Sequence, residues 1–224
     1  MNLALRTVLV AMWITVASPL AAGESEELLR FDMLALQRDG ATVVSPATWR
    51  AQGVEAEAIR GTAEGPQANE FGVSARGLLP EGVFGFSGRS PGEGNYAAPF
   101  WEFTLSPRGG IAIAFTALVV DVGAATVLSA NDTQWDYALT WSVDEHQARV
   151  GLIEGPSVRS KESSAIHSEE SKDITIDLSH LPAQENPVTF RITRLSAESF
   201  SGVASQRAGW LGKVVVRGEV RRGS

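Results

Sequence analysis

The stretch WEFTLSPRGGIAIAFTALVVDV, residues 101–122, decides the fold of this chain. Its first half alternates apolar Trp101, Phe103 and Leu105 with polar Glu102 and Thr104. Because successive side chains of a β-strand point to opposite faces, this alternation predicts a strand with one buried and one polar face. Trp101 is therefore predicted to be a core residue rather than a platform for a ligand.

A turn is predicted directly after this strand. Pro107 and the pair Gly109-Gly110 permit a tight reversal, because proline fixes φ and glycine reaches positive φ at little cost. Apolar residues at positions 111, 113 and 115 then resume the inward pattern. The whole stretch is thus read as two strands joined by a short turn.

The rest of the chain repeats this pattern of short alternating runs between glycines and prolines. Such a pattern is typical of an all-β protein, and an antiparallel two-sheet β-sandwich is predicted. The predicted strands cover residues 28–34, 54–60, 70–75, 96–105, 111–122, 135–143, 149–154, 173–178, 188–195 and 211–220. The segments 61–94 and 157–172 are predicted to be loops.

Several aromatic residues follow the same alternation. In WDYALTWSV, Trp135, Tyr137 and Trp141 share one face with the apolar residues 139 and 143, which favours a packed interior over a strip that stacks on sugars. Trp135 and Trp49 lie near predicted loops. These two tryptophans are therefore the better candidates for stacking on a ligand.

The first residues are predicted to be a signal peptide. Arg6 precedes an apolar run that is too short for a membrane span, and Ala21-Ala22-Gly23 matches the small-residue pattern before a cleavage site. We expect a signal peptide at 1–23 and a single sandwich domain at 24–224. The product is expected to be secreted or periplasmic, with no membrane span in the mature chain.

Charge and composition exclude several classes of function. The net charge of −7 disfavours nucleic acid as a partner, since nucleic-acid-binding proteins cluster Lys and Arg. Neither a glycine-rich phosphate loop nor a G-x-S-x-G motif is present, and the three histidines lack the spacing of a zinc site. No cofactor and no metal are therefore predicted.

The polar faces of the later strands hold the most interesting pair. Arg191 and Asp177 both alternate with apolar residues, so they would lie on one face if their strands were neighbours. They would then offer a donor and an acceptor to sugar hydroxyls. The alternative is a solvated sheet face with one cross-strand ion pair.

Paired carboxylates raise the hypothesis of a glycoside-acting enzyme. Glu102, Asp136, Asp173 and Asp177 all alternate onto polar faces, so two of them could flank one cleft. No motif with a catalytic mechanism accompanies them. The chain is therefore predicted to be non-enzymatic, and Glu102 is kept as a candidate binding residue.

Two segments carry a resemblance to a known group of proteins. DITIDLSHLPAQENPVTFRITR, with Val214–Gly218 after it, and YAAPFWEFTLSPRGGIAIAF resemble the secreted β-sandwich proteins of planctomycetes and verrucomicrobia, many of which end in a PEP-CTERM sorting tail. The resemblance implies a jelly-roll-like sandwich similar to carbohydrate-binding modules and lectin-like domains.

The chain departs from that group at two places. Gly212-Lys213 stands where the group has Asp-Asn, and these residues lack the hard oxygen ligands that calcium needs. The segment Gly218–Ser224 offers no apolar run of the kind found in a sorting tail. A structural calcium at this point is not expected, and release or non-covalent retention is expected in place of anchoring.

Three functional hypotheses follow. The first is an exported, non-enzymatic module that binds a polysaccharide or cell-surface glycan, or takes part in the cell surface or extracellular matrix. The second is a structural module that contacts other envelope proteins without a small ligand. The third is a glycoside-acting enzyme. The candidate ligand-binding residues are Arg191, Asp177, Trp135, Trp49 and Glu102.

Overall fold

The computed structural model describes most of the chain. The described residues are 25–33, 36–39, 42–62, 84–87, 100–127, 133–144, 146–158, 168–195 and 206–222. The predicted signal peptide at 1–23 and the predicted strand at 70–75 lie outside them. Among the described residues, all regular secondary structure is β-strand.

The strands come in the following order along the chain. They are β1 (Glu26–Phe31), β2 (Gln37–Asp39), β3 (Thr42–Ser45), β4 (Trp49–Arg50), β5 (Val54–Ala56), β6 (Ile59–Thr62), β7 (Phe84–Ser87), β8 (Phe100–Pro107), β9 (Ile111–Val127), β10 (Thr133–Val143), β11 (His146–Val158), β12 (Ser168–Asp177), β13 (Val188–Arg194) and β14 (Gln206–Arg222).

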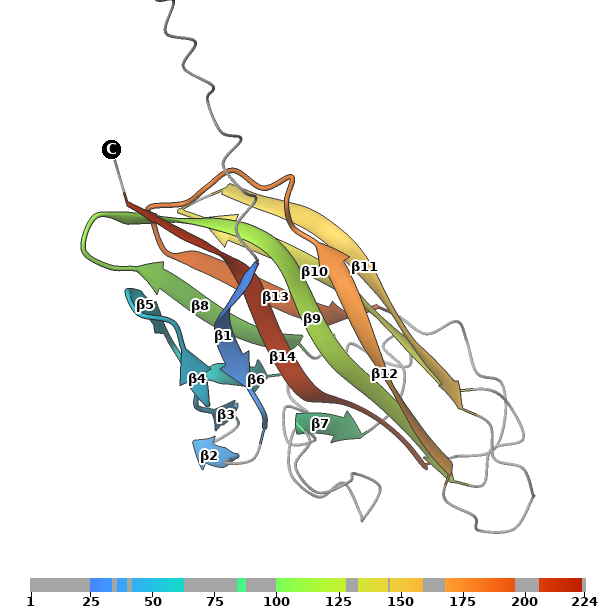
Figure 1. The fold of residues 1–224 in the computed structure, drawn as a ribbon. Helices are drawn as coiled ribbons and strands as arrows, with labels where there is room; N and C mark the ends of the chain where they lie inside the picture. The colour runs from blue at the N-terminus through green and yellow to red at the C-terminus, as the bar shows by residue number, and fades with distance from the viewer. Residues whose placement is uncertain are drawn as a thin grey trace, which may run out of the picture.

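These strands form two antiparallel sheets packed face to face (Figure 1). In the described part of the chain, the six-stranded sheet has the order β12-β9-β14-β1-β4, with β7 beside β14. The eight-stranded sheet has the order β11-β10-β13-β8-β6-β3-β2, with β5 beside β8. The predicted all-β, two-sheet antiparallel sandwich is confirmed.

Aromatic rings join the two sheets in the core. Phe31 and Phe115 belong to the six-stranded sheet, and Phe103 and Phe190 to the eight-stranded sheet. The centroid of Phe103 lies 5.2 Å from that of Phe31 and 5.5 Å from that of Phe190, and Phe115 meets Phe190 edge-on at 5.4 Å. Trp101 is buried as predicted, so the inner side of β8 belongs to the core.

The predicted turn at 107–110 forms, but it joins two layers rather than two paired strands. Gly109 and Gly110 have φ values of 67° and 70°, which glycine adopts without strain. Strand β8 enters this turn from the eight-stranded sheet, and β9 leaves it in the six-stranded sheet. The turn therefore closes one end of the sandwich.

A β-bulge changes the inward register of β9. Ile113 and Phe115 are buried, and beyond them the buried residues are at positions 118, 120, 122 and 124. The pairing with β14 shifts between Arg217 and Gly218, so that Thr116 is an extra residue in β9. This bulge lets one long strand keep its apolar side on the core on both sides of the shift.

Two predicted loops are partly strand. Strand β12 begins at Ser168, within the segment 157–172 that was predicted to be a loop, and β7 lies within the predicted loop 61–94. The loop prediction is wrong at these positions. Strand β12 pairs with β9 along the whole of Ser168–Asp177. The hydrogen bonds of this ladder stabilise the strand although its polar start shows no apolar alternation.

Candidate functional site

The outer face of the eight-stranded sheet carries a cluster of charged side chains on adjacent strands. Glu102 of β8 is directly opposite Arg60 of β6 on one side and Arg191 of β13 on the other. Phe103 follows Glu102 on β8, and Phe190 precedes Arg191 on β13. Both phenylalanines face the core. Alternation therefore turns Glu102 and Arg191 outward.

Glu102 binds both arginines, one with each carboxylate oxygen. Its Oε1 accepts hydrogen bonds from Nε of Arg60, at 3.1 Å, and from Nη2 of Arg60. Its Oε2 accepts a hydrogen bond from Nε of Arg191 at 2.6 Å and forms an ion pair with Nη2 at 2.6 Å. Only 7% of the Glu102 side chain is exposed, against 55% for Arg60 and 35% for Arg191.

This arrangement fixes the charge of Glu102. Burial alone would raise the pKa of the carboxyl group, but hydrogen bonds from Arg60 and Arg191 and their positive charges outweigh burial and lower the pKa below its usual value. Glu102 is therefore an anion at neutral pH, with both oxygens engaged. It is suited to holding the two guanidiniums in place rather than to donating a proton as a general acid.

Hydroxyl and amide groups surround this ion cluster. The Oγ1 atoms of Thr104 and Thr189 are 2.9 Å apart across β8 and β13. Thr140 of β10 donates to the carbonyl oxygen of Arg191 at 3.5 Å and accepts from Nε2 of Gln147 at 3.5 Å. The outer face thus carries polar side chains on β8, β13, β10 and β11 beside the ion cluster.

Arg191 has an additional partner in Phe100. Its guanidinium carbon lies 4.1 Å from the centroid of the Phe100 ring, within the range of a cation–π interaction. Phe100 itself is buried. Two opposite neighbours, the ring and the Glu102 carboxylate, therefore fix the orientation of this guanidinium.

The structure separates Asp177 from Arg191. Strand β12 pairs with β9 in the six-stranded sheet, whereas β13 lies between β10 and β8 in the eight-stranded sheet. The prediction that their strands could be neighbours is wrong, because the same alternation fits either sheet. Asp177 instead accepts a hydrogen bond from the backbone N–H of Ser179 at 2.8 Å, and hydrogen bonds from the side chain and the backbone of Ser179 lower the pKa of Asp177.

The two candidate tryptophans do not extend the polar face in the described structure. Trp49 lies on β4, at the edge of the six-stranded sheet, and 45% of it is exposed. It is opposite Arg30 in the pairing of β4 with β1. Trp135 lies in β10 of the eight-stranded sheet, but its side chain is outside the described part of the structure.

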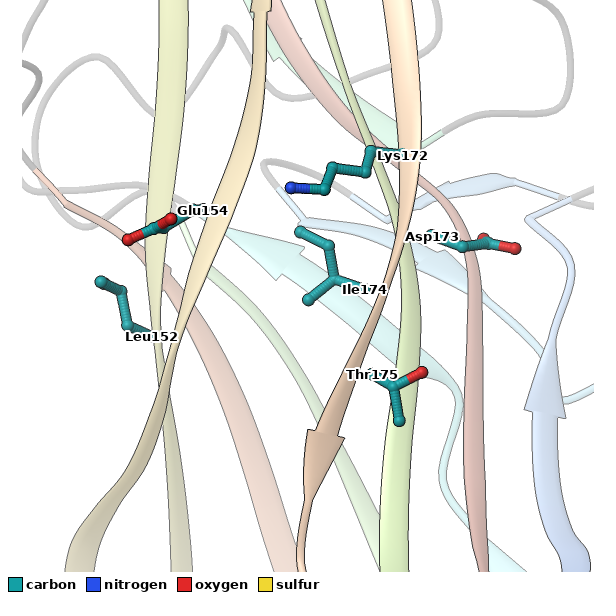
Figure 2. Close-up of a pocket in the computed structure, with 6 residues that line it drawn as sticks. All are labelled: Leu152, Glu154, Lys172, Asp173, Ile174 and Thr175. Atoms are coloured by element: carbon teal, nitrogen blue, oxygen red, sulfur yellow. The ribbon is translucent and has the colours of Figure 1, made fainter.

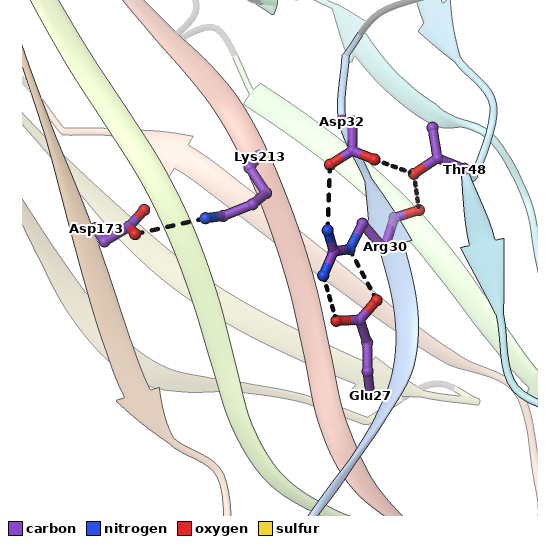
Figure 3. A network of polar contacts seen from close by, with 6 residues as sticks. All are labelled: Glu27, Arg30, Asp32, Thr48, Asp173 and Lys213. Carbon is purple, nitrogen blue, oxygen red and sulfur yellow. Dashed lines mark hydrogen bonds and ion pairs between the residues drawn. The ribbon is translucent and has the colours of Figure 1, made fainter.

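A second set of ion pairs lies on the outer face of the six-stranded sheet (Figure 3). Arg30 donates to Glu27 at 2.8 Å and 2.6 Å and lies 3.9 Å from Asp32. Lys213 lies 3.4 Å from Asp173. At the neighbouring position of β9, burial and the negative charge of Asp173 raise the pKa of Asp121.

Sequence reasoning missed two arginines. Arg60 ends the predicted strand 54–60, and no role was predicted for it. An outward-facing Glu102 nevertheless indicates a cation on a neighbouring strand. Arg194 alternates with the inward residues of β13 and is buried opposite Tyr137. Burial lowers the pKa of Arg194 to about 10 and raises the pKa of Tyr137, whose ring lies 5.5 Å from Trp101.

A groove runs along one side of the sandwich, where the edge strands β11 and β12 meet. Figure 2 shows Lys172 and Ile174 of β12 turned toward β11, with Leu152 and Glu154 on the other wall. Its volume is about 320 Å³. None of the groove residues belongs to the Arg60–Glu102–Arg191 cluster, and the groove combines apolar Leu152 and Ile174 with polar and charged residues of both strands.

Within the described residues, no cluster of three His, Cys, Asp or Glu side chains could hold a metal ion. The same residues include no helix long and apolar enough to cross a membrane.

Comparisons with known proteins found distant structural neighbours. No protein-family model and no curated protein matches the chain. Among solved structures, the chain is similar to one described as "CBM4 structure and function", with 16% identity, a TM-score of 0.32, and coverage of 75% of this chain and 96% of that chain.

A second solved structure is the family 11 carbohydrate-binding module from Clostridium thermocellum in complex with a β-1,3-1,4-mixed-linked tetrasaccharide. It shows 9% identity, a TM-score of 0.24, and coverage of 88% of this chain and 97% of that chain. With TM-scores this low, neither neighbour decides what the polar face binds.

Proposed function

We propose that this chain is an exported, non-enzymatic module that binds a glycan on the outer face of its eight-stranded sheet. One observation carries the proposal: the exposed guanidinium of Arg60 and the partly exposed guanidinium of Arg191 are held by a buried carboxylate among hydroxyl and amide groups. Sugars present hydroxyl groups in a flat array, and such groups pair with donors and acceptors of this kind.

The rigidity of the face supports the same proposal. Arg60, Glu102 and Arg191 stand on three adjacent hydrogen-bonded strands, so their spacing is set by the sheet rather than by a loop. Glu102 and Phe100 further restrict Arg191. A preformed surface loses less conformational entropy on binding, which favours recognition of a glycan that makes few contacts per sugar unit.

Glycan binding is tested with the full chain on an array of immobilised polysaccharides. We expect saturable binding to at least one of them, weakened about tenfold by Arg191→Ala, because a charge-assisted hydrogen bond is lost. Thr189→Val removes only a hydroxyl at nearly constant shape and should weaken binding less, without affecting folding. Trp49→Ala, on the opposite sheet, is the control and should bind as the wild type does.

Two results would reject the proposal. Absence of saturable binding to every polysaccharide would reject glycan recognition. Unchanged binding by both Arg191→Ala and Thr189→Val would reject this face as the binding surface.

Export is tested separately. The apolar run before Ala21-Ala22-Gly23 supports removal of residues 1–23. Mass spectrometry of the protein recovered outside the cytoplasm should give a chain that starts at about residue 24. Recovery of the protein only in the cytoplasm, with residues 1–23 still attached, would contradict export.

A second candidate function is an assembly module, and the groove between β11 and β12 favours it. Both are edge strands, and Leu152 exposes apolar surface there. Edge strands offer unpaired backbone groups to another chain. Analytical ultracentrifugation of the wild type tests for self-association. If the chains associate through this edge, Leu152→Asp should abolish the association. A monomeric wild type would exclude self-association through this edge.

A further inference from the structure

Three arginines lie in one row across the outer face of the eight-stranded sheet. The strand pairing aligns Arg60 of β6, Glu102 of β8, Arg191 of β13, Thr140 of β10 and Arg149 of β11 in this order. Neighbouring strands are about 4.8 Å apart, so arginines on alternate strands are spaced by about 10 Å. The row therefore presents three regularly spaced cations perpendicular to the strands.

The charge of this row is opposite to that of the protein. Glu102 is the row's one carboxylate, against three arginines, whereas the whole chain has a net charge of −7. Among the described charged groups of this face outside the row, Glu154 is opposite Asp136, and Glu55 pairs with Arg108. A row with excess positive charge on an acidic protein attracts anions to one defined place.

The guanidiniums of Arg60 and Arg191 keep donors for a ligand. Each guanidinium has five N–H groups in a planar fork, and Glu102 contacts only Nε and Nη2 of each arginine. Nη1 of each arginine is not among the atoms that contact Glu102. Arg149 is exposed on the edge strand β11.

Exposed aromatic rings are not found among the described side chains of this face. Among the side chains that the structure describes, the aromatic residue turned to this face is Phe100, which is buried beside Arg191. Neutral sugars gain much of their affinity from stacking on exposed aromatic rings. A face with arginines in place of exposed rings is better suited to a ligand that brings negative charge, because charge-assisted hydrogen bonds are the stronger ones.

We infer that the ligand of this face is an acidic polysaccharide, whose carboxylate or sulfate groups bind Arg60, Arg191 and Arg149 in turn. This inference rests on the proposed glycan-binding function and names its substrate class. The spacing of alternate strands is comparable to a disaccharide repeat, so one linear chain could lie along the row. Its acidic groups would then meet the arginines, with the hydroxyl of Thr140 between Arg191 and Arg149.

The test compares polymers that differ only in charge. Binding of the full chain to polygalacturonate is measured by isothermal titration calorimetry, in parallel with the same polymer after reduction of its carboxyl groups to alcohols. Dextran sulfate and unmodified dextran form the second pair. We expect binding to at least one acidic polymer, loss of binding to its neutral counterpart, and affinity that falls as salt increases.

Two arginine variants locate the site. Arg149→Ala should weaken binding about tenfold, which corresponds to about 1.4 kcal/mol, while folding is unaffected because Arg149 is exposed. Arg217→Ala removes an exposed arginine of the six-stranded sheet and should leave affinity unchanged. Equal weakening by both variants would overturn the assignment to this row.

The outcomes separate this inference from the proposed function. Equal binding to the acidic polymer and its neutral counterpart would overturn the inference and leave glycan binding standing. Absence of binding to all four polymers, together with a blank polysaccharide array, would overturn both. Binding to dextran sulfate but not to polygalacturonate would support the inference and identify sulfate as the recognised group.

Discussion

The outer faces of both sheets carry ion pairs, but the ratio of acidic to basic side chains is reversed between them. On the eight-stranded sheet one carboxylate, Glu102, is shared by two arginines. On the six-stranded sheet one arginine, Arg30, is shared by the carboxylates of Glu27 and Asp32, and Lys213 pairs with Asp173 (Figure 3). The first cluster has excess positive charge, and the second has excess negative charge.

The two faces also differ in burial. Glu102 is almost completely buried, whereas the side chains of Arg30 and Asp173 are substantially exposed. Exposed ion pairs contribute little to stability because water and salt screen them, but removing one partner of a buried pair leaves a charge with poor solvation. One face is therefore built around a fixed internal counter-ion, and the other is an ordinary solvated surface.

The largest effect is expected from Glu102→Ala. It leaves two neighbouring guanidiniums without their shared counter-ion, and we expect the free energy of unfolding to fall by about 2–3 kcal/mol in urea denaturation. The loss is smaller than for a fully buried pair, because both arginines can reach water. Asp173→Ala is the matched variant on the other sheet and should change stability by less than about 1 kcal/mol.

Similar losses of stability for Glu102→Ala and Asp173→Ala would contradict this difference between the two faces, since both clusters would then behave as solvated surface pairs.

The pH dependence of stability should have opposite signs on the two faces. The pKa of Glu102 is lowered in the folded protein, so its contribution is present above the unfolded value, about 4.3, and is lost as pH falls toward the folded pKa. The pKa of Asp121 is raised by burial and by Asp173, so its ionisation costs stability as pH rises through the window between about 3.9 and the folded value.

Denaturation curves across acidic pH check these signs. At neutral pH, wild type should be more stable than Glu102→Gln and less stable than Asp121→Asn. Both differences should shrink toward zero as pH falls. A difference of the same sign for both variants would contradict the assignment.

At neutral pH, Asp121→Asn should stabilise the protein slightly. Asp121 and Asp173 are directly opposite each other on β9 and β12, and like charges at such positions are destabilising. Removing one of the charges at constant shape should add up to about 1 kcal/mol to the free energy of unfolding. Thermal denaturation at pH 7 measures it, and a loss of stability would indicate that the contact with Lys213 dominates.

The smallest effect is expected from Trp49→Ala. This tryptophan is exposed on an edge strand of the six-stranded sheet, so its loss should change stability by less than about 0.5 kcal/mol. Glycan binding should be unchanged as well. Reduced binding by Trp49→Ala with normal binding by Arg149→Ala would transfer the ligand site to the six-stranded sheet.

Much of the fold could be predicted from local pattern. Trp101 and Phe103 are buried, and Glu102 faces outward, as alternation indicated. The short strand β3 and the polar start of β12 were not predicted, because their residues show no clear apolar alternation. In these segments the ladder hydrogen bonds to β6 and β9 determine the conformation.

Only part of the candidate site could be predicted. Glu102 and Arg191 were identified separately from their polar faces, and the structure places them in contact. Asp177 was expected on the same face as Arg191 if their strands were neighbours, yet its strand belongs to the other sheet. Arg60 was missed, because a lone arginine at the end of a short strand gives no sign of which carboxylate it will meet.

By itself, the sequence determined which side of each strand is apolar, since a period of two residues follows from backbone geometry alone. The tertiary structure decided which strands are neighbours, and therefore that Glu102 lies between Arg60 and Arg191 while Asp177 lies elsewhere. It also decided that a bulge at Thr116 reverses the inward side of β9. The reason is that strand pairing depends on the packing of residues far apart in the chain, and local alternation is the same for every partner.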